Sequence, residues 1–398
     1  MPDAQFQWHP SARAFVAGVQ VTPCMQAATA QIPPTPLAAA FSGLANAFGT
    51  VPFCVTDSAT VDLCALPPSH FATLTGGTSG APKVIARSQA SWTASFETNA
   101  ALFDYGRGDS IAVLGALSHS LALYGVLEAL HLGMDIHALS DLGPRAQSTQ
   151  LHDHKCAILY ATPTQLRLFP AAQPLPALRL ILCGGGALDA ATQDHIARLC
   201  PNAALHVFYG AAETSFVTLG DASTPEGSVG RAYPNADIAV RDKDAQGIGS
   251  VWVRSPYLFD HYLQGDSPHT RRNGDWTTVG ERGHLDPQGN LFLKGRAGRV
   301  MNVADQTVYP EELEAAICAL THAPYCAVMA RADTLRGQHI IAVLPGPEDA
   351  GLRQTLPRAC TTRGLHPPRE VLFLEPFPIL PSGKPDLQQI ATLTGAQV

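Results

Sequence analysis

The sequence predicts an α/β protein: a large N-terminal α/β domain with a mainly parallel sheet and a β-rich subdomain, then a small, mobile α+β C-terminal domain. Short apolar runs alternate with helical patterns between residues 111 and 209, and strand–helix–strand alternation favours a parallel sheet. From about residue 229, short β-like runs are separated by Gly and Pro turns. The 398 residues, 46% of them hydrophobic, suffice for two or three domains with buried cores.

The first elements follow in chain order. Residues 1 to about 70 show weak periodicity and several prolines, and they predict no clear element. Residues 187–199 are amphipathic at helical spacing and lie between two expected strands. The expected strands are 111–115, 156–160, 178–183 and 205–209.

The apolar stretch 111–134 is long enough to raise the question of a membrane span. It contains Glu128 and two histidines, and ionisable groups are costly at bilayer depth. A buried strand, a turn and a buried helix explain this stretch more simply.

The last hundred residues predict a separate α+β unit. A helix begins at Pro310, since Pro is favoured at the first helical position and two acidic residues follow it. The other expected elements are strands at 325–330, 339–344 and 371–374 and a helix near 350–363. We therefore expect an N-terminal domain at 1–297, with a shortened outer lobe, and a mobile C-terminal lid domain at 298–398.

Composition excludes several classes of protein. The high apolar fraction and the small net charge per residue argue against disorder. An acidic chain, of net charge −7 and without a run of Lys or Arg, is not expected to be a general nucleic-acid binder. Nine scattered cysteines without a CxxC spacing predict reduced, buried thiols rather than disulfides or a zinc site. The N-terminal residues lack the pattern of a signal peptide, so a cytoplasmic location is expected.

Four Gly-bearing segments carry the candidate chemistry. The strongest is TGGTSGAPK, Thr75–Lys83, where backbone N–H groups, hydroxyls and a lysine could enclose a phosphate. It is not a Walker A loop, because two residues separate its last Gly from the Lys. A surface turn is the alternative.

The other segments follow expected strands or lie in a late loop. CGGGAL at 183–188 is either a ligand-binding edge of the sheet or a tight strand-to-helix turn. YGAAET at 209–214 offers a glutamate for a phosphate-bound metal, or a solvated surface residue. PSGKPD at 381–386 contains one of only five lysines, and an ammonium there can neutralise charge that develops during attack on a phosphate.

Taken in order, these segments resemble the adenylate-forming superfamily of acyl-CoA synthetases, adenylation enzymes and luciferases. Further similarity lies in GSVGRAYPNADIAV with VWVRSPYLFDHYL, in NGDWTTVGERGHLDPQGNLFLKGRAGRV and in NVADQTVYPEELEAAI. The resemblance covers residues 74 to about 391. It implies that ATP activates a carboxylic acid as an acyl-adenylate and that a thiol then accepts the acyl group.

The resemblance also implies roles for individual residues. Lys384, Glu213 and Thr75 would be catalytic, Glu213 would bind Mg²⁺, and Gly298 would be the hinge about which the C-terminal domain turns. Glu281 and Arg296 would bind the ribose and a nearby phosphate. The remaining ATP-binding residues would be Thr75, Gly76, Gly77, Thr78, Ser79, Gly80 and Lys83 for the phosphates, and Gly184, Gly185, Gly186, Tyr209, Gly210 and Ala211 for the adenine.

Some residues depart from the family pattern. Ala212 replaces a usual Thr, Glu281 a usual Asp, and Gly298 a usual Asp or Lys. Asp305 stands where Gly is common beside the path of the thiol arm, so its side chain could narrow that path. Only 74 residues precede the phosphate loop, which implies a reduced outer lobe and leaves room for a homodimer.

The acyl pocket is expected behind the adenine turn. His119, Tyr124, Phe208 and Phe216 would surround an aryl or short acyl group, although Tyr124 and Phe208 could equally be core residues. The leading hypothesis is an AMP-forming acid–CoA ligase. The alternatives are an enzyme that loads an acyl carrier protein phosphopantetheine, and a non-catalytic acyl or nucleotide sensor.

Overall fold

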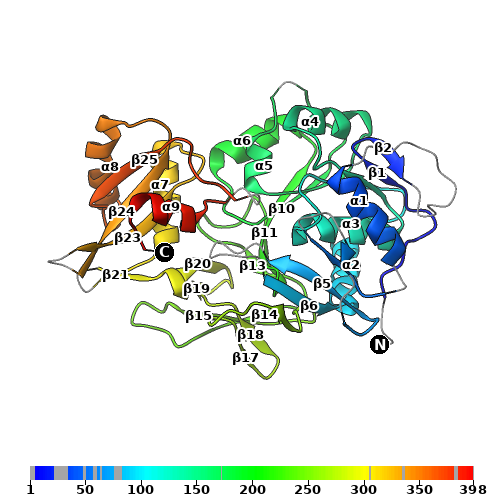
Figure 1. The fold of residues 1–398 in the computed structure, drawn as a ribbon, viewed down its shortest axis with the longest axis horizontal. Coiled ribbons are helices and arrows are strands. Elements are labelled where there is room, and N and C mark those ends of the chain that lie inside the picture. Colours follow the sequence, from blue (N-terminus) through cyan, green and yellow to red (C-terminus); the bar gives the residue numbers. More distant parts are fainter. Residues whose placement is uncertain are drawn as a thin grey trace.

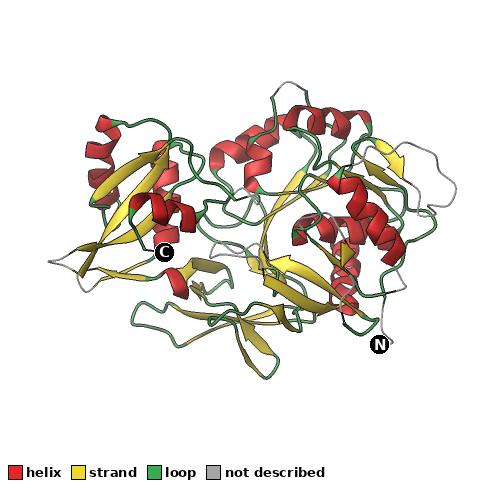
Figure 2. Cartoon of the chain, in the orientation of Figure 1, coloured by secondary structure: helices red, strands yellow, loops and turns green. Residues whose placement is uncertain are grey.

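The computed structural model describes residues 5–21, 35–47, 51–56, 61–62, 65–75, 83–171, 173–303, 306–333, 337–380 and 384–397. Figure 1 shows a larger body, coloured blue to yellow, beside a smaller body formed by the C-terminal residues in yellow to red. Strand-rich segments lie along the lower side of the larger body, and helices cover its upper side (Figure 2).

A nine-stranded sheet is the centre of the larger body, with the order β13-β12-β11-β10-β9-β7-β8-β1-β2. Its six inner strands, from β11 to β1, are parallel, and antiparallel strands occupy both edges. The prediction of a mainly parallel sheet is therefore confirmed. The strands are β1 Ala14–Val16, β2 Val19–Val21, β7 Ser110–Val113, β8 Asp135–Ala138, β9 Ile158–Ala161, β10 Leu180–Gly184, β11 Ala204–Ala211, β12 Ser215–Gly220 and β13 Arg231–Ala232.

Helices cover both faces of this sheet because alternate residues of its strands are apolar on each side. Leu180 and Leu182 pack in one core cluster, whereas Ile181 and Cys183 pack in another. The first cluster contains residues of α1 Pro36–Ala47, α2 Gln89–Phe103 and α3 Ser120–Leu132. The second contains residues of α4 Pro144–Asp153, α5 Pro163–Arg167 and α6 Ala190–Leu199.

Two expectations for this region can be compared in detail. The helix expected at 187–199 begins at Ala190, since the side chain of Asp189 accepts a hydrogen bond from the Thr192 N–H and caps the helix. The stretch 111–134 forms β7, a turn and the buried helix α3, as expected. Among the described residues, no helix is both long and apolar enough to cross a membrane.

Two further sheets complete the larger body. A five-stranded sheet with the order β16-β6-β5-β3-β4 contains β3 Cys54–Val55, β4 Val61–Asp62, β5 His70–Thr75, β6 Lys83–Ser88 and β16 His261–Gln264. A six-stranded sheet accounts for the β-rich texture expected after residue 229. It contains β14 Asp237–Arg241, β15 Gly249–Arg254, β17 Arg271–Asn273, β18 Trp276–Thr278, β19 Glu281–Leu285 and β20 Leu291–Arg296.

The smaller body has a three-stranded sheet with helices on both faces. α7 and α8 pack on one face with a core that includes Leu313 and Cys360, and α9 packs on the other with Leu387 and Ile390. Its elements are η1 Ala297–Arg299, β21 Met301–Val303, β22 Gln306–Val308, α7 Pro310–Thr321, β23 Ala327–Asp333, β24 Gly337–Pro345, α8 Ala350–Thr362, β25 Glu370–Leu374 and α9 Leu387–Thr394.

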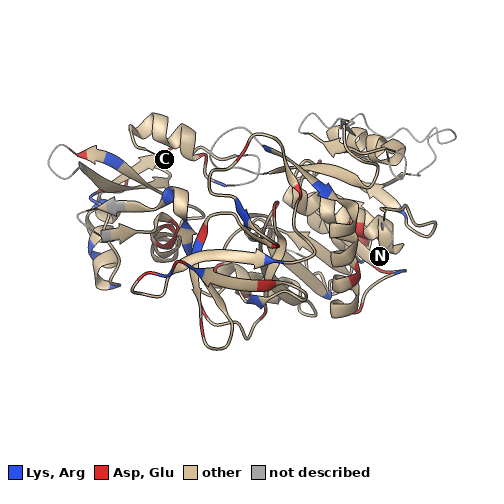
Figure 3. Cartoon of the chain, turned by 90° about the horizontal axis from the view of Figure 1, so that it is seen from below, with Lys and Arg blue, Asp and Glu red and all other residues tan. Residues whose placement is uncertain are grey.

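Charges are sparse and mixed over the molecule. In the view of Figure 3, acidic and basic positions are interspersed along both bodies rather than gathered on one face. The seven cysteines within the described ranges carry free thiols, and six of them are buried. Cys24 and Cys64 lie outside the described residues.

Candidate active site

A cavity of about 1250 Å³ lies at the carboxyl ends of the parallel strands. Segments that follow β7, β9, β10 and β11 line it, together with the β5–β6 hairpin and Lys384 from the smaller body. Parallel sheets bind ligands at this edge, because the loops that leave neighbouring strands meet there. Most of the residues predicted for the site therefore converge on one cavity.

The two ends of the predicted phosphate loop are held side by side. Thr75 and Lys83 pair directly across the β5–β6 hairpin, and both line the cavity. Leu74 joins this hairpin to the start of α3, since its carbonyl accepts a hydrogen bond of 3.2 Å from the Ser120 hydroxyl. Gly76, Gly77, Thr78, Ser79 and Gly80 lie outside the described residues.

The turn that carries Glu213 is tightly constrained. A Cβ on Gly210 would lie 2.0 Å from the carbonyl oxygen of Ser215, so only glycine fits there. The fully buried guanidinium of Arg87 donates hydrogen bonds to the carbonyls of Ala212 and Tyr257. Burial lowers the pKa of Arg87 to about 10, while the negative charges of Asp260 and Glu213 act in the opposite direction. Arg87 thus stays protonated at neutral pH, and its hydrogen bond to the Ala212 carbonyl fixes the turn that carries Glu213.

Glu213 lines the cavity, and its carboxylate is held in place by a tyrosine. Tyr262 donates a hydrogen bond of 2.8 Å to Glu213 Oε1, and its hydroxyl lies 2.9 Å from the Thr270 hydroxyl. Lys83 Nζ lies 5.5 Å from the centre of the Tyr262 ring. One carboxylate that faces a phosphate site fits Mg²⁺, which is commonly bound by one or two carboxylates and substrate phosphates. Among the described residues, no group of three or more His, Cys, Asp or Glu side chains is arranged to hold a metal ion.

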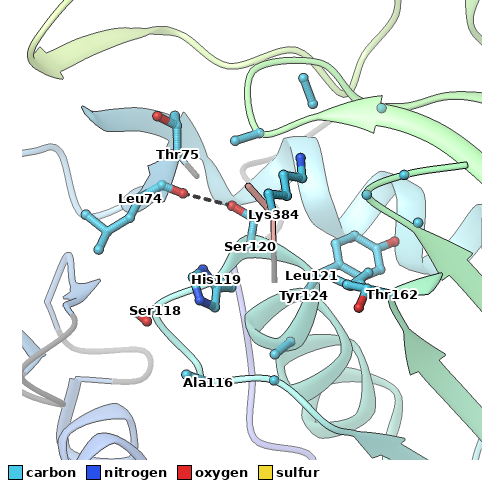
Figure 4. Close-up of a pocket in the computed structure, with 18 of the residues that line it drawn as sticks. Leu74, Thr75, Ala116, Ser118, His119, Ser120, Leu121, Tyr124, Thr162 and Lys384 are labelled. Carbon is cyan, nitrogen blue, oxygen red and sulfur yellow. Dashed lines mark hydrogen bonds between the residues drawn. The ribbon is translucent and has the colours of Figure 1, made fainter. Parts of the chain in front are cut away.

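Lys384 enters the cavity from the smaller body. Figure 4 shows its side chain over the start of α3, with Leu74 and Thr75 on one side and Tyr124 and Thr162 on the other. Burial lowers the pKa of Lys384, and the positive charge of Arg296 lowers it further. Arg296 also lines the cavity, and its Nε lies 3.0 Å from Glu281 Oε1. Glu281 is buried beneath Arg296 and, among the described residues, is not part of the cavity lining.

The residues predicted to bind adenine are only partly brought together. Gly184, Gly185 and Gly186 line the cavity, as do Gly210 and Ala211. Tyr209 is not among the described lining residues, although it precedes Gly210 directly. The close approach of β10 and β11 leaves no space at Gly184, where a Cβ would lie 2.2 Å from the Phe208 ring.

The predicted acyl residues form part of an aromatic wall. His119 and Phe208 line the cavity with Tyr124, and Trp92, Tyr160 and Phe216 add to the same wall. Tyr124 is 4% exposed and packs edge to face against Phe216, so it is a core residue as well as a wall residue.

The polar atoms of this wall are bound by the protein interior. The Tyr124 hydroxyl donates to Ser95 Oγ at 2.8 Å, and Trp92 Nε1 donates to Ser215 Oγ at 3.2 Å. The Tyr160 hydroxyl donates to Glu128 Oε2 at 2.7 Å. These three side chains therefore present mainly ring carbons to the cavity.

Gly298 lies in the short helix η1, between β20 of the larger body and β21 of the smaller one. A Cβ there would lie 2.6 Å from Nε2 of His269, so the glycine permits a close approach by the loop that precedes β17. Asp305, which was expected to narrow the thiol path, lies outside the described residues.

Three residues of the site were not predicted from the sequence. Arg87 and Trp92 follow the phosphate loop and carried no motif, so only the fold places them under the Glu213 turn and beside the acyl region. Tyr262 lies within a segment that resembled the family, but nothing in its spacing indicated a contact with Glu213.

Comparisons with known proteins identify the family. A family model described as AMP-binding enzyme matches residues 53–263. The chain is 28% identical over 343 residues to an uncharacterized acyl-CoA ligase, YhfT, of Bacillus subtilis, which covers 83% of this chain and 70% of the relative. It is 29% identical over 246 residues to a putative long chain fatty acid-CoA ligase, VraA, of Staphylococcus epidermidis, with 61% and 53% covered. The chain thus spans only about half of the Staphylococcus relative.

A solved structure shows the same fold. The o-succinylbenzoate CoA synthetase of Bacillus subtilis, in complex with its acyl-adenylate, has a TM-score of 0.70 at 21% identity, with 80% of this chain and 68% of that chain covered. The predicted class, an AMP-forming acyl-CoA synthetase-like ligase, is confirmed by the family match and by the curated relatives. The chain therefore belongs to the AMP-binding enzyme family, within the adenylate-forming superfamily.

Proposed function

We propose that this chain activates a carboxylic acid with ATP and transfers the acyl group to the thiol of CoA. The observation that carries the proposal is the meeting of Lys83, Glu213, Arg296 and Lys384 in one cavity, although the four residues lie far apart in sequence. These three cations and this carboxylate, which are among the charged residues that line the cavity, match the needs of a reaction in which negative charge shifts between phosphate groups.

The first half-reaction is the attack of the carboxylate oxygen on the α-phosphorus of ATP. A new P–O bond forms, the bond to the β-phosphate breaks, and pyrophosphate leaves. Lys384 would stabilise the charge that develops between the carboxylate and the α-phosphate. Lys83 and the loop from Thr75 to Lys83, including Gly76 to Gly80, would hold the departing phosphates.

Mg²⁺ would supply positive charge at the phosphate oxygens. Glu213 would hold it, Tyr262 would orient the Glu213 carboxylate through its hydrogen bond, and Arg87 would keep the Glu213 turn rigid. Glu281 would fix Arg296 toward the ribose, and the three glycines at 184–186 would lie against the adenine with Gly210 and Ala211.

In the second half-reaction, the thiol attacks the acyl carbon and AMP leaves. Lys384 occupies the cavity, so the smaller body must turn away to admit a thiol arm. We propose Gly298 as the hinge, with residues 1–297 and 298–398 as the two moving units. The wide conformational freedom of glycine suits that position.

The wall of the acyl region favours an aryl or short apolar acid. Tyr124, Phe208 and their aromatic neighbours offer ring faces, while the hydroxyls of Tyr124 and Tyr160 are already bound in the interior. An apolar acid would lose no hydrogen bonds on entering such a space, whereas a polar one would leave its own groups unpaired.

An acyl carrier protein phosphopantetheine is the second candidate acceptor. CoA is preferred here because the relatives named above are described as acyl-CoA ligases. A sensor without turnover is less well supported, since a binding protein has no need of a lysine at the transition-state position.

The test is pyrophosphate release with ATP and Mg²⁺ across a panel of aryl and of short- to long-chain acids, with and without CoA. We expect release with an aryl or short acid and faster turnover with CoA. Release that CoA does not accelerate, followed by acyl transfer to a phosphopantetheinylated carrier, would reassign the acceptor. ATP binding without release for any acid would point to the sensor.

A further inference from the structure

Arg167 joins the two bodies across the mouth of the cavity. It lies at the end of α5 in the larger body, and its Nη1 donates a hydrogen bond of 3.2 Å to the carbonyl of Pro324 in the smaller body. Its Nη2 lies 2.7 Å from Oδ2 of Asp189, the residue that caps α6. One guanidinium thus binds a fixed carboxylate on one body and a backbone carbonyl on the other.

The contact is connected to Lys384 through packed residues. Tyr325, next to Pro324, packs against Phe377 with ring centres 4.9 Å apart. The segment after Phe377 is closed by two backbone hydrogen bonds, from Leu380 N to Lys384 O and from Asp386 N to Pro378 O. These contacts link Pro324 to Lys384 within the smaller body, so the two residues should move together when that body moves.

The hydrogen bond between Arg167 and Pro324 differs from other contacts between the bodies, because Arg167 lies far in sequence from the proposed hinge at Gly298. Lys294 and Glu312 also join the bodies, at 2.7 Å, but Lys294 lies only four residues from Gly298. A contact beside a hinge can persist during rotation, whereas one across the cavity mouth must break. Pro324 and Tyr325 line the cavity with Arg167, and the hydrogen bond between Arg167 and Pro324 is exposed to solvent, so this contact lies at the mouth of the cavity.

We propose that Arg167 is a positioning residue that latches the smaller body in the arrangement that places Lys384 in the cavity. The latch favours the adenylate-forming half-reaction and must release before a thiol can enter. This inference rests on the proposed function for its kinetic consequence, but not for its structural one.

The test compares Arg167→Gln with Arg179→Gln. Arg179 is a matched control, because it also binds one carboxylate, Asp109 at 3.0 Å, and backbone carbonyls, but only within the larger body. Asp189→Asn is a second variant, since asparagine can still cap α6 but no longer attracts the guanidinium with a full charge.

Small-angle X-ray scattering of the full chain reports the arrangement of the bodies directly. We expect Arg167→Gln to shift the distance distribution toward separated bodies, Asp189→Asn to shift it less, and Arg179→Gln to leave it unchanged. Distributions identical to the wild type for Arg167→Gln would overturn the proposal, whatever the rates.

The half-reactions provide the second readout. We expect Arg167→Gln to lower kcat for pyrophosphate release roughly fivefold, without raising KM for ATP, because a partly exposed charged hydrogen bond contributes about that much. Thioester formation from supplied acyl-adenylate should be unchanged or faster. Equal loss in both half-reactions would also overturn the latch. If the wild type releases no pyrophosphate with any acid, the proposed function fails alone and scattering still decides the latch.

Discussion

Lys384 is the residue on which the proposed first half-reaction depends most. Only five lysines are present, and two of them, Lys83 and Lys384, line the same cavity. Lys384 belongs to the smaller body, whereas the other residues labelled in Figure 4 belong to the larger one. Its contribution should therefore be confined to the step that takes place while the bodies are in the present arrangement.

Lys384→Ala should lower the rate of pyrophosphate release at least about 100-fold, since it removes charge stabilisation at the transition state. Thioester formation from a supplied acyl-adenylate should stay close to the wild-type rate. Measuring the two half-reactions separately tests both statements. An equal loss in both would show that the lysine supports the fold or the binding of AMP rather than the first chemical step.

The pH dependence of the first half-reaction should also report Lys384. Burial lowers the pKa of this ammonium below that of an ordinary lysine, and only the protonated form can stabilise negative charge. The rate of pyrophosphate release should thus fall with rising pH, beginning at a lower pH than a solvated lysine would predict. The thioester step from supplied adenylate should lack this alkaline limb, and its presence in both steps would assign the limb to another group.

Helix α3 is the element that connects the active site to the core. Its first residues lie beside Leu74 and Lys384, and its middle carries Glu128, which is fully buried. Asn99, Tyr105 and Tyr160 donate hydrogen bonds to the Glu128 carboxylate. Tyr160 also lines the cavity, so the hydrogen bonds around Glu128 help to fix the shape of the aromatic wall.

Glu128 should make the stability of the fold dependent on pH. Burial raises its pKa to about 7, against the effect of the hydrogen bonds that it accepts. Between its ordinary pKa and pH 7 the folded state therefore binds a proton that the unfolded state has lost. The stabilisation that Glu128 gives the folded state is fully present below pH 4.5. The free energy of unfolding then declines by roughly 3 kcal/mol as the pH rises from 4.5 through 7.

Glu128→Gln should remove that slope, because glutamine does not titrate. Urea unfolding between pH 5 and pH 8 measures it, with Glu97→Gln, an exposed position on α2, as the control. We expect the free energy of unfolding of Glu128→Gln to change less with pH than that of the wild type. Parallel curves for the two proteins would show that Glu128 stays ionised in the folded state.

The whole molecule combines two bodies that have separate cores and share one cavity. Leu313 and Val328 belong to a core cluster of the smaller body, whereas the clusters around the nine-stranded sheet lie in the larger one. Bodies with separate cores can move relative to each other at little cost in burial. The proposed reaction needs that motion.

Gly298→Pro should slow thioester formation and largely spare pyrophosphate release, whereas Lys384→Ala should do the reverse. Proline fixes φ near −65° and restricts a pivot at that position. Because a Cβ at position 298 would lie 2.6 Å from Nε2 of His269, the His269 ring must swing aside to admit the proline. Pyrophosphate release should then remain within about threefold of the wild type, whereas thioester formation should fall more than tenfold. Gly143→Pro is the control for a general effect of proline, because Gly143 has φ −72° at the start of α4, away from the hinge, and nothing lies within 4 Å of an added Cβ there. Equal rates for wild type and Gly298→Pro in both steps would place the hinge elsewhere.

Much of this protein was predictable from sequence because its signals are local. Short apolar runs predicted β7, β9, β10 and β11, and the order of six motifs predicted the family. A strand or a Gly-rich turn is encoded within a few residues, so its position can be read along the chain. The expected helix at 187–199 was wrong only in its first three residues, where Asp189 forms the cap.

The contacts that complete the site could not be predicted in this way. Arg87 binds the Ala212 carbonyl across 125 positions of sequence, Tyr262 binds Glu213 across 49, and Arg167 reaches Pro324 across 157. Each depends on the relative placement of elements, which follows from the packing of whole sheets and helices rather than from any short pattern. Motif order and spacing therefore determined the family and the reaction class, whereas the tertiary structure decided which side chains hold the Glu213 turn, which rings form the aromatic wall of the cavity and which residue joins the two bodies.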